Sequence, residues 1–102
     1  MGMDKLIEQI KKSMRISHNK LDDILKSDIK AGTLDLFISG VNPFVIEGES
    51  KEKTVKEDAL LHKALELYCK WQEDFQGKAE QYAKCYESLK KAMSLSGEYH
   101  EG

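Results

Sequence analysis

The stretch TVKEDALLHKALELYCKWQEDFQG, residues 54–77, decides the fold class of this 102-residue chain. Its apolar side chains recur every three or four positions, which is the spacing of one face of an α-helix. The members of this stripe are Leu60, Leu61, Ala64, Leu65, Tyr68, Trp71 and Phe75. Because Thr54 and Glu57 have capping-box spacing, a helix is predicted from Val55 to Phe75, about 30 Å long.

A second long helix is predicted from Ala79 to Leu95, directly after this stretch. Its apolar face consists of Tyr82, Ala83, Tyr86, Leu89 and Met93. Gly77 ends the preceding helix, and Ser96-Gly97 ends this one. The connection is short, so the two helices are expected to be antiparallel neighbours.

Two further helices are predicted in the N-terminal half of the chain. Apolar residues at helical spacing predict a short helix over residues 4–14, with Asp4 as its cap and its end near Ile16. Ser17 offers a second cap, and Gly40 a stop. After Ser17 one apolar stripe continues through Leu21, Ile24, Leu25, Ile29, Leu34, Phe37, Ile38 and Val41. Gly32 lies inside this pattern, where either a bend or a closely crossing helix would explain a missing side chain.

Residues 42–53 have no helical period and are expected to form a long loop. Asn42-Pro43 favours a turn, and Phe44, Val45 and Ile46 form a short apolar run after it. This run would either tuck under the helices or insert into a partner. The polar residues that follow, and the tail 98–102, are expected to be flexible.

Length and composition fit one small globular domain, residues 1–102, with a bundle of about four helices and an all-α fold class. Hydrophobic residues make up 40% of the chain, charged residues 33%, and there is a single proline. The net charge of −2, from 16 basic and 18 acidic residues, disfavours nucleic acid as the main partner. No apolar run is long enough for a membrane span, and the first residues do not resemble a signal peptide.

The motifs that usually carry catalysis or cofactor binding are missing from the sequence, so no enzymatic activity, no cofactor and no metal are expected. The histidines, His18, His62 and His100, are too scattered to suggest a metal site. Asp22 and Asp23 are adjacent on a helix and do not face each other, so a solvated helix face is favoured over an acid/base pair. Cys69 and Cys85 form no CxxC motif and are interpreted as reduced core residues.

The aromatic residues of the two long helices are expected to pack between them. Tyr68, Trp71 and Phe75 recur at helical spacing, as do Tyr82 and Tyr86. The alternative is that Trp71 or Tyr68 anchors a subunit interface, because aromatic residues with a polar atom are enriched there.

Three segments point to a family. They are MDKLIEQIKKSMRISHNKLDDILKSDIKAGTLDLFISGV (residues 3–41), ALLHKALELYCKW (59–71) and YAKCYESLKKAMSLSGEY (82–99). In this order they resemble the head-to-tail connector, or head completion, proteins of tailed bacteriophages and prophages. The steps Leu67–Lys70 and Leu95–Tyr99 are the most specific parts. The chain departs from the family pattern at Trp71–Gln76, where many members have a short Asn-Phe-Gly-type turn and an acidic stretch.

The resemblance implies a structural virion protein. Such proteins join below the portal protein after DNA packaging and form a homo-oligomeric ring, twelve-fold by this resemblance, around the exit channel. The ring gives the next neck or tail-completion protein its docking surface, near the packaged DNA. The protein would reside in the host cytoplasm during assembly and then in the virion neck. The candidate interaction residues are Pro43, Phe44, Val45, Ile46, Trp71, Leu95, Glu98 and Tyr99.

The main alternative is a small helical DNA-binding or regulatory protein from the same kind of mobile element. Such a protein would need a basic recognition helix. The helix predicted from Val55 carries Lys56, Lys63 and Lys70, but five acidic residues are mixed with them. This mixture of charges argues against the alternative.

Overall fold

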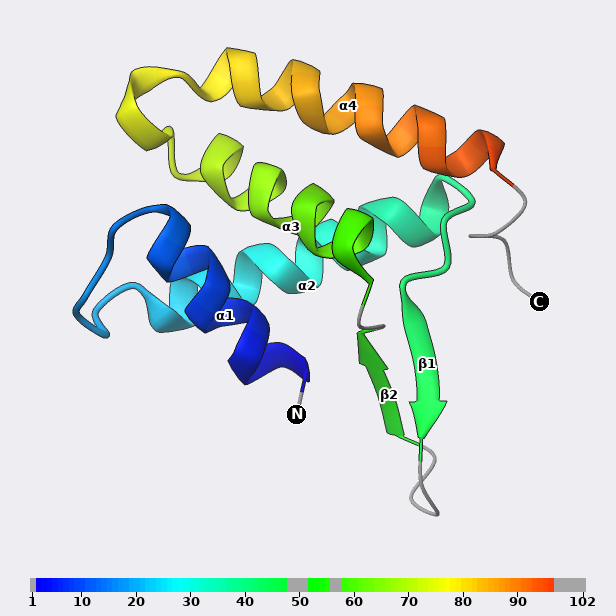
Figure 1. Ribbon diagram of the computed structural model, residues 1–102, viewed down its shortest axis with the longest axis horizontal. Helices are drawn as coiled ribbons and strands as arrows, with labels where there is room; N and C mark the ends of the chain where they lie inside the picture. Colours follow the sequence, from blue (N-terminus) through cyan, green and yellow to red (C-terminus); the bar gives the residue numbers. More distant parts are fainter. Residues whose placement is uncertain (1, 48–51, 56–57, 97–102) are drawn as a thin grey trace.

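Four α-helices and one β-hairpin make up the computed structural model, which describes residues 2–47, 52–55 and 58–96 (Figure 1). In chain order the elements are α1 (Gly2–Ser13), α2 (Asp22–Ile38), β1 (Phe44–Glu47), β2 (Glu52–Val55), α3 (Ala59–Gln72), the short 3-10 turn η1 (Phe75–Gly77) and α4 (Ala79–Leu95). The predicted all-α bundle is confirmed, and α4 has the predicted bounds.

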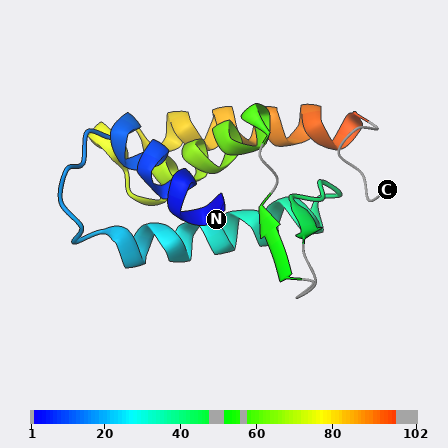
Figure 2. The same ribbon diagram turned by 60° about the horizontal axis from the view of Figure 1, so that its bottom comes forward.

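Helix α3 is the centre of the bundle and packs against both α2 and α4. Helices α3 and α4 run antiparallel, as predicted, while α2 and α4 run in the same direction (Figure 1). In Figure 2, α4 and α2 lie on opposite sides of the molecule, with α1 and α3 between them. The core between the helices consists of Leu6, Ile7, Ile10, Met14, Leu25, Ile29, Leu36, Val41, Leu61, Ala64, Leu65, Leu67, Cys69, Tyr86 and Met93.

Gly32 marks the point where α2 crosses close to α3. A Cβ atom at this position would lie 3.0 Å from Leu65 Cδ2 and 3.2 Å from two ring atoms of Tyr68. Of the two explanations that the sequence left open, the structure therefore supports the close crossing.

The predicted start of α3 is wrong. Thr54 and Val55 belong to β2, and the helix begins four residues later at Ala59. Its N-cap is Asp58, which accepts a 3.0 Å hydrogen bond from the backbone N–H of Leu61. Thr and Val favour extended backbone, and Val55 pairs with Phe44 in the hairpin, so strand pairing replaces the capping box.

The expected loop over residues 42–53 is therefore structured in part. Strands β1 and β2 form a two-stranded antiparallel sheet in which Phe44 pairs with Val55 and Glu47 with Glu52. The positions between the strands, residues 48–51, lie outside the described residues, as do residues 97–102, so the structure does not test the expected flexibility there.

The second helix also begins later than predicted, at Asp22 instead of after Ser17. The intervening segment is held by Lys11, which is only 4% exposed. Its ammonium group donates a 2.7 Å hydrogen bond to Asn19 and lies 2.9 Å from a carboxylate oxygen of Asp22. These contacts hold residues 19–22 against α1.

Glycines in the left-handed backbone conformation lie where the sequence predicted helix ends. Gly40 follows α2 with φ of 95°, and Gly77 precedes α4 with φ of 68°. Asp74 and Gln76 are also left-handed, with φ of 49° and 56°, so the chain reverses tightly between the two long helices. As a result α3 ends at Gln72, short of the predicted Phe75.

Candidate interaction surface

Helix α2 is apolar on two sides. Its inner side is buried against the bundle and consists of Leu25, Ile29, Gly32, Thr33 and Leu36. Other apolar residues of the same helix face solvent, namely Ile24, Leu34, Phe37 and Ile38. Neighbouring apolar pairs such as Ile24-Leu25 and Leu36-Phe37 could have revealed this, because adjacent helical residues point about 100° apart. The sequence had instead been interpreted as one continuous stripe.

Exposed apolar residues gather toward one end of the molecule. The C-terminal ends of α2 and α4 lie at this end, and α3 begins nearby (Figure 1). We call this region the apolar end; it comprises Leu34, Phe37, Ile38, Leu60 and Leu95. Ile38 is 75% exposed and Leu95 is 76% exposed, so both are almost uncovered. Several large apolar side chains exposed together are typical of a protein–protein contact surface.

The predicted interaction residues of the hairpin divide into two groups. Pro43 is fully buried, and the Phe44 ring packs at 6.3 Å from that of Phe37, so the start of the apolar run tucks against the bundle. Val45 and Ile46 lie in β1, and their side chains are outside the described part of the structure.

The remaining candidates lie on α3, on α4 and beyond it. Trp71 is half-buried; its ring lies 5.5 Å from that of Tyr68 and 6.0 Å from that of Tyr86, in the seam between α3 and α4. Leu95 belongs to the apolar end. Glu98 and Tyr99 lie outside the described residues. Among the candidates whose side chains the structure describes, Leu95 and Phe44 lie with newly found exposed residues, Leu95 as a member of the apolar end and Phe44 against Phe37.

A polar cluster joins α2 to α4 beside the apolar end. The Tyr86 hydroxyl donates a 2.6 Å hydrogen bond to Asp35 Oδ2, and the Lys90 ammonium donates a 3.0 Å hydrogen bond to the same oxygen. Burial opposes ionisation of Asp35, but the bonds from Tyr86 and Lys90 outweigh it and lower the pKa of that carboxyl. Burial, and then the bond to Asp35, raises the pKa of Tyr86, so the phenol keeps its proton. The cluster fixes the spacing of the two helices.

A second carboxyl group, Asp28, borders the outward side of α2 in a different environment. Burial, together with a hydrogen bond to Glu73 and repulsion from its charge, raises the pKa of Asp28 to about 7. Its Oδ2 atom is buried and makes no hydrogen bond to the described residues.

The structure corrects the interpretation of one cysteine. Cys69 is buried, as expected, and burial raises the pKa of its thiol. Cys85 is exposed, because it lies on the side of α4 that faces away from α3. Both thiols are free. The described residues contain no group of three potential metal ligands, and among them no helix is long and apolar enough to cross a membrane.

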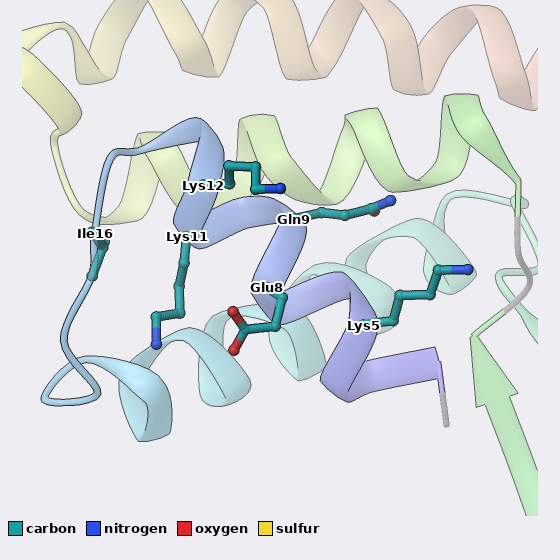
Figure 3. A pocket seen from close by; sticks show the side chains of 6 residues that line it. All are labelled: Lys5, Glu8, Gln9, Lys11, Lys12 and Ile16. Atoms are coloured by element: carbon teal, nitrogen blue, oxygen red, sulfur yellow. The ribbon is translucent and has the colours of Figure 1, made fainter.

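A shallow depression of about 350 Å³ lies along α1 and is lined by Lys5, Glu8, Gln9, Lys11, Lys12 and Ile16 (Figure 3). In Figure 3 Lys5, Gln9 and Lys12 extend along one side of the helix, while Glu8 and Lys11 extend on the other. The ammonium group of Lys11 already contacts Asp22 and Asn19. Because these side chains do not converge, the depression is a poor candidate for a ligand site.

Comparison with protein families matches residues 6–100 to the model described as "Phage connector protein". The chain belongs to the phage connector family. Comparison with curated proteins and with solved structures gave no significant match. The match begins within α1 and covers the hairpin and the other three helices, and it confirms the family inferred by resemblance.

Membership of the connector family is consistent with the exposed residues of the apolar end. The family is structural, and its members contact other phage head or tail proteins, which is consistent with a place in the virion neck. A structural protein that acts by binding other proteins needs an exposed contact surface and does not need a catalytic site. The absence of enzymatic activity stays a prediction.

Proposed function

We propose that copies of this connector protein form a ring below the portal after DNA packaging and present the docking surface for the next neck or tail protein. The match to the phage connector family over residues 6–100 carries this proposal. The apolar end supports it, since Ile38 and Leu95 are about three-quarters exposed in the single chain and would gain stability from burial in an assembly.

A ring also requires two different contact surfaces on each copy. When one surface of a subunit meets a different surface of the next, rotation closes the chain of contacts into a ring. Exposed apolar residues on both α2 and α4, which lie on opposite sides of the bundle, meet this requirement (Figure 2).

We assign contacts with the portal or with neighbouring copies to two segments, the region 42–53 and the tail from Glu98. Helix α4 ends at Leu95, a member of the apolar end, and the tail follows it in the sequence. Deletion of residues 98–102 should impair assembly with the portal while leaving the helix content unchanged. Unchanged assembly would remove the tail from the proposal.

The experiment that tests the function uses the parent phage or an inducible prophage. An early stop codon in this gene, followed by induction and negative-stain electron microscopy, should give DNA-filled or leaking heads beside separate, complete tails. Supplying the intact gene in trans should restore joined particles. Joined particles at normal titre without the gene would overturn the proposal.

The DNA-binding alternative gains no support from α3. Lys63 and Lys70 share the carboxylate of Glu66, at 3.4 and 3.1 Å, and the acidic residues Asp58 and Glu73 cap the two ends of the helix, so α3 has no uniformly basic face. A salt-dependent shift of duplex DNA by the purified protein would reverse this judgement.

A further inference from the structure

The outward side of α2 carries a regular seam of exposed residues. We call it the α2 outer face; its members are Ile24, Ser27, Ala31, Leu34 and Ile38, all of them exposed. They are separated alternately by three and four positions, which is the spacing of the residues that meet a partner helix in a coiled coil. The seam covers about 21 Å at about 1.5 Å per residue.

The outward side of α4 carries a second seam with the same spacing. We call it the α4 outer face; its members are Cys85, Ser88, Ala92 and Leu95, again all exposed. Small side chains at the first three positions let another helix approach closely. The α2 outer face also has small residues at two of its positions, Ser27 and Ala31, so two such helices could lie close together there.

We propose that the α2 outer face of one copy packs against the α4 outer face of the next copy, as two parallel helices. This inference deepens the proposed function and rests on it, because a ring supplies the repeated copies. Helices α2 and α4 run in the same direction on opposite sides of the bundle (Figures 1 and 2). Side-by-side copies in similar orientations would therefore bring the two faces together in parallel.

The spacing of the two seams defines a register. Residues 24, 27, 31 and 34 of α2 have the same spacing as residues 85, 88, 92 and 95 of α4. When the two series are aligned, Ile24 lies against Cys85 and Leu34 against Leu95 of the neighbour. Between these two pairs, Ser27 faces Ser88 and Ala31 faces Ala92 of the neighbour. The close approach at these small residues would let Leu34 cover the exposed side chain of Leu95.

The charges beside the seams favour the same register. Asp28 and Asp35 border one side of the α2 outer face, and Lys84 and Lys91 border one side of the α4 outer face. In a parallel coiled coil, a residue that flanks the seam on one helix faces a flanking residue of the partner that lies five positions further along in the register. Lys84 is level with position 23 of the neighbour and therefore faces Asp28, and Lys91 in the same way faces Asp35. The side chain of Asp35 is 40% exposed, so it can accept a second cation besides Lys90.

Pairing of α2 with another α2 lacks this complementarity. In an antiparallel arrangement the acidic flank of one helix would meet the acidic flank of the other, with Asp28 near Asp35. Two copies of α4 would likewise bring Lys84 and Lys91 together. Like charges in such positions disfavour an interface, so the α2–α4 pairing is the one that the charges select.

The exposed native thiol of Cys85 allows a direct test by cross-linking. The variant Ile24→Cys should form disulfides between copies under mild oxidation, because facing positions approach the Cα separation of about 6 Å that disulfides span. Each copy carries both partners, so non-reducing gels should show a ladder of oligomers, both for the purified full-length protein and in induced lysates. Adding Cys85→Ala should abolish the ladder.

The matched control is Lys26→Cys, an exposed position on α2 outside the seam, which should give no ladder. Lys84→Glu with Lys91→Glu, in the Ile24→Cys background, should reduce cross-linking several-fold without changing the helix content. A ladder no stronger than that of the control, in both samples, would overturn this interface and indicate another occupant for the α2 outer face. Failure of the proposed function is distinguishable, since it would appear as normal particles without the gene.

Discussion

Tyr86 on α4 and Asp35 on α2 are joined by a 2.6 Å hydrogen bond, the shortest of the side-chain contacts between the described helices. The Tyr86 ring is fully buried, while the carboxylate of Asp35 reaches the surface. This single contact links the core of the bundle to the border of the α2 outer face. It therefore couples the stability of the chain to the geometry of its proposed contact surface.

Removal of the Tyr86 hydroxyl should destabilise the protein. Tyr86→Phe keeps the ring in the core but leaves Asp35 with Lys90 as its remaining partner in this cluster. The free energy of unfolding should fall by about 1 kcal/mol, since hydrogen bonds to charged groups are strong but Asp35 is partly solvated. Urea denaturation of Tyr86→Phe beside Tyr82→Phe measures this; equal losses would show that the bond contributes nothing specific.

A methyl group at Gly32 should destabilise the bundle although alanine favours helices. The added Cβ would lie 3.0 Å from Leu65 Cδ2 and 3.2 Å from ring atoms of Tyr68. Leu65 is fully buried and cannot move aside freely, so the strain should outweigh the gain of about 1 kcal/mol in helix propensity. Thermal denaturation should show a lower Tm for Gly32→Ala. Ser27→Ala, exposed on the same helix, should not lower it, and a higher Tm for Gly32→Ala would contradict the close crossing.

The Asp28 carboxyl should make stability decrease as pH rises from about 4 to 7. In the folded chain burial and Glu73 raise the pKa of Asp28 from 3.8 to about 7, so the folded state holds a proton that the unfolded state releases in this range. Stability falls wherever the folded state binds more protons. Asp28→Asn, which resembles the protonated acid, should flatten this dependence and raise stability at pH 8.

The control variant is Asp23→Asn, which removes an exposed carboxylate from the same helix and so shows the effect of losing one negative charge there. Asp35 and Glu66 act in the opposite direction at lower pH, because their pKa values are lowered on folding. Their contribution is present above the ordinary carboxyl pKa and is lost as the pH falls further. An unchanged slope between pH 4 and 7 in Asp28→Asn would contradict the assignment to this pair.

Replacement of the buried Lys11 should loosen the segment between α1 and α2. Lys11→Met keeps the aliphatic part but leaves Asp22 without the ammonium 2.9 Å away. Loss of one partner from a mostly buried pair should cost about 2 kcal/mol. Limited trypsin digestion should cleave at Arg15 or Lys20 faster than in the parent protein. Lys12→Met, exposed one position later, is the control, and equal cleavage in both variants would dismiss the role of Lys11.

Helical periodicity predicted the number of helices, their order and the bounds of α4, because apolar residues at three- and four-residue spacing have one favourable arrangement in water. Local sequence signals gave the wrong start for α3, because the capping-box pattern of Thr54 and Glu57 predicted a helix from Val55 and the helix begins at Ala59. Strand pairing of Val55 with Phe44, distant along the chain, decided against it. The hairpin was missed for the same reason, since residues 44–47 and 52–55 show their strand character only when paired.

The candidate surface depended even more on the tertiary structure. The sequence pointed to the segment after Asn42, to Trp71 and to the tail. The exposed residues Ile24, Leu34 and Ile38 belong to the same apolar stripe as the buried residues of α2, and the pattern alone does not separate the two groups. Which side of an apolar helix is covered depends on its neighbours, and for α2 the packing of α1 and α3 decides it. The sequence by itself thus determined the helical class and the connector family, because both follow from the pattern of residues along the chain. Only the folded chain decided which apolar residues remain in water, because burial is set by elements distant in sequence.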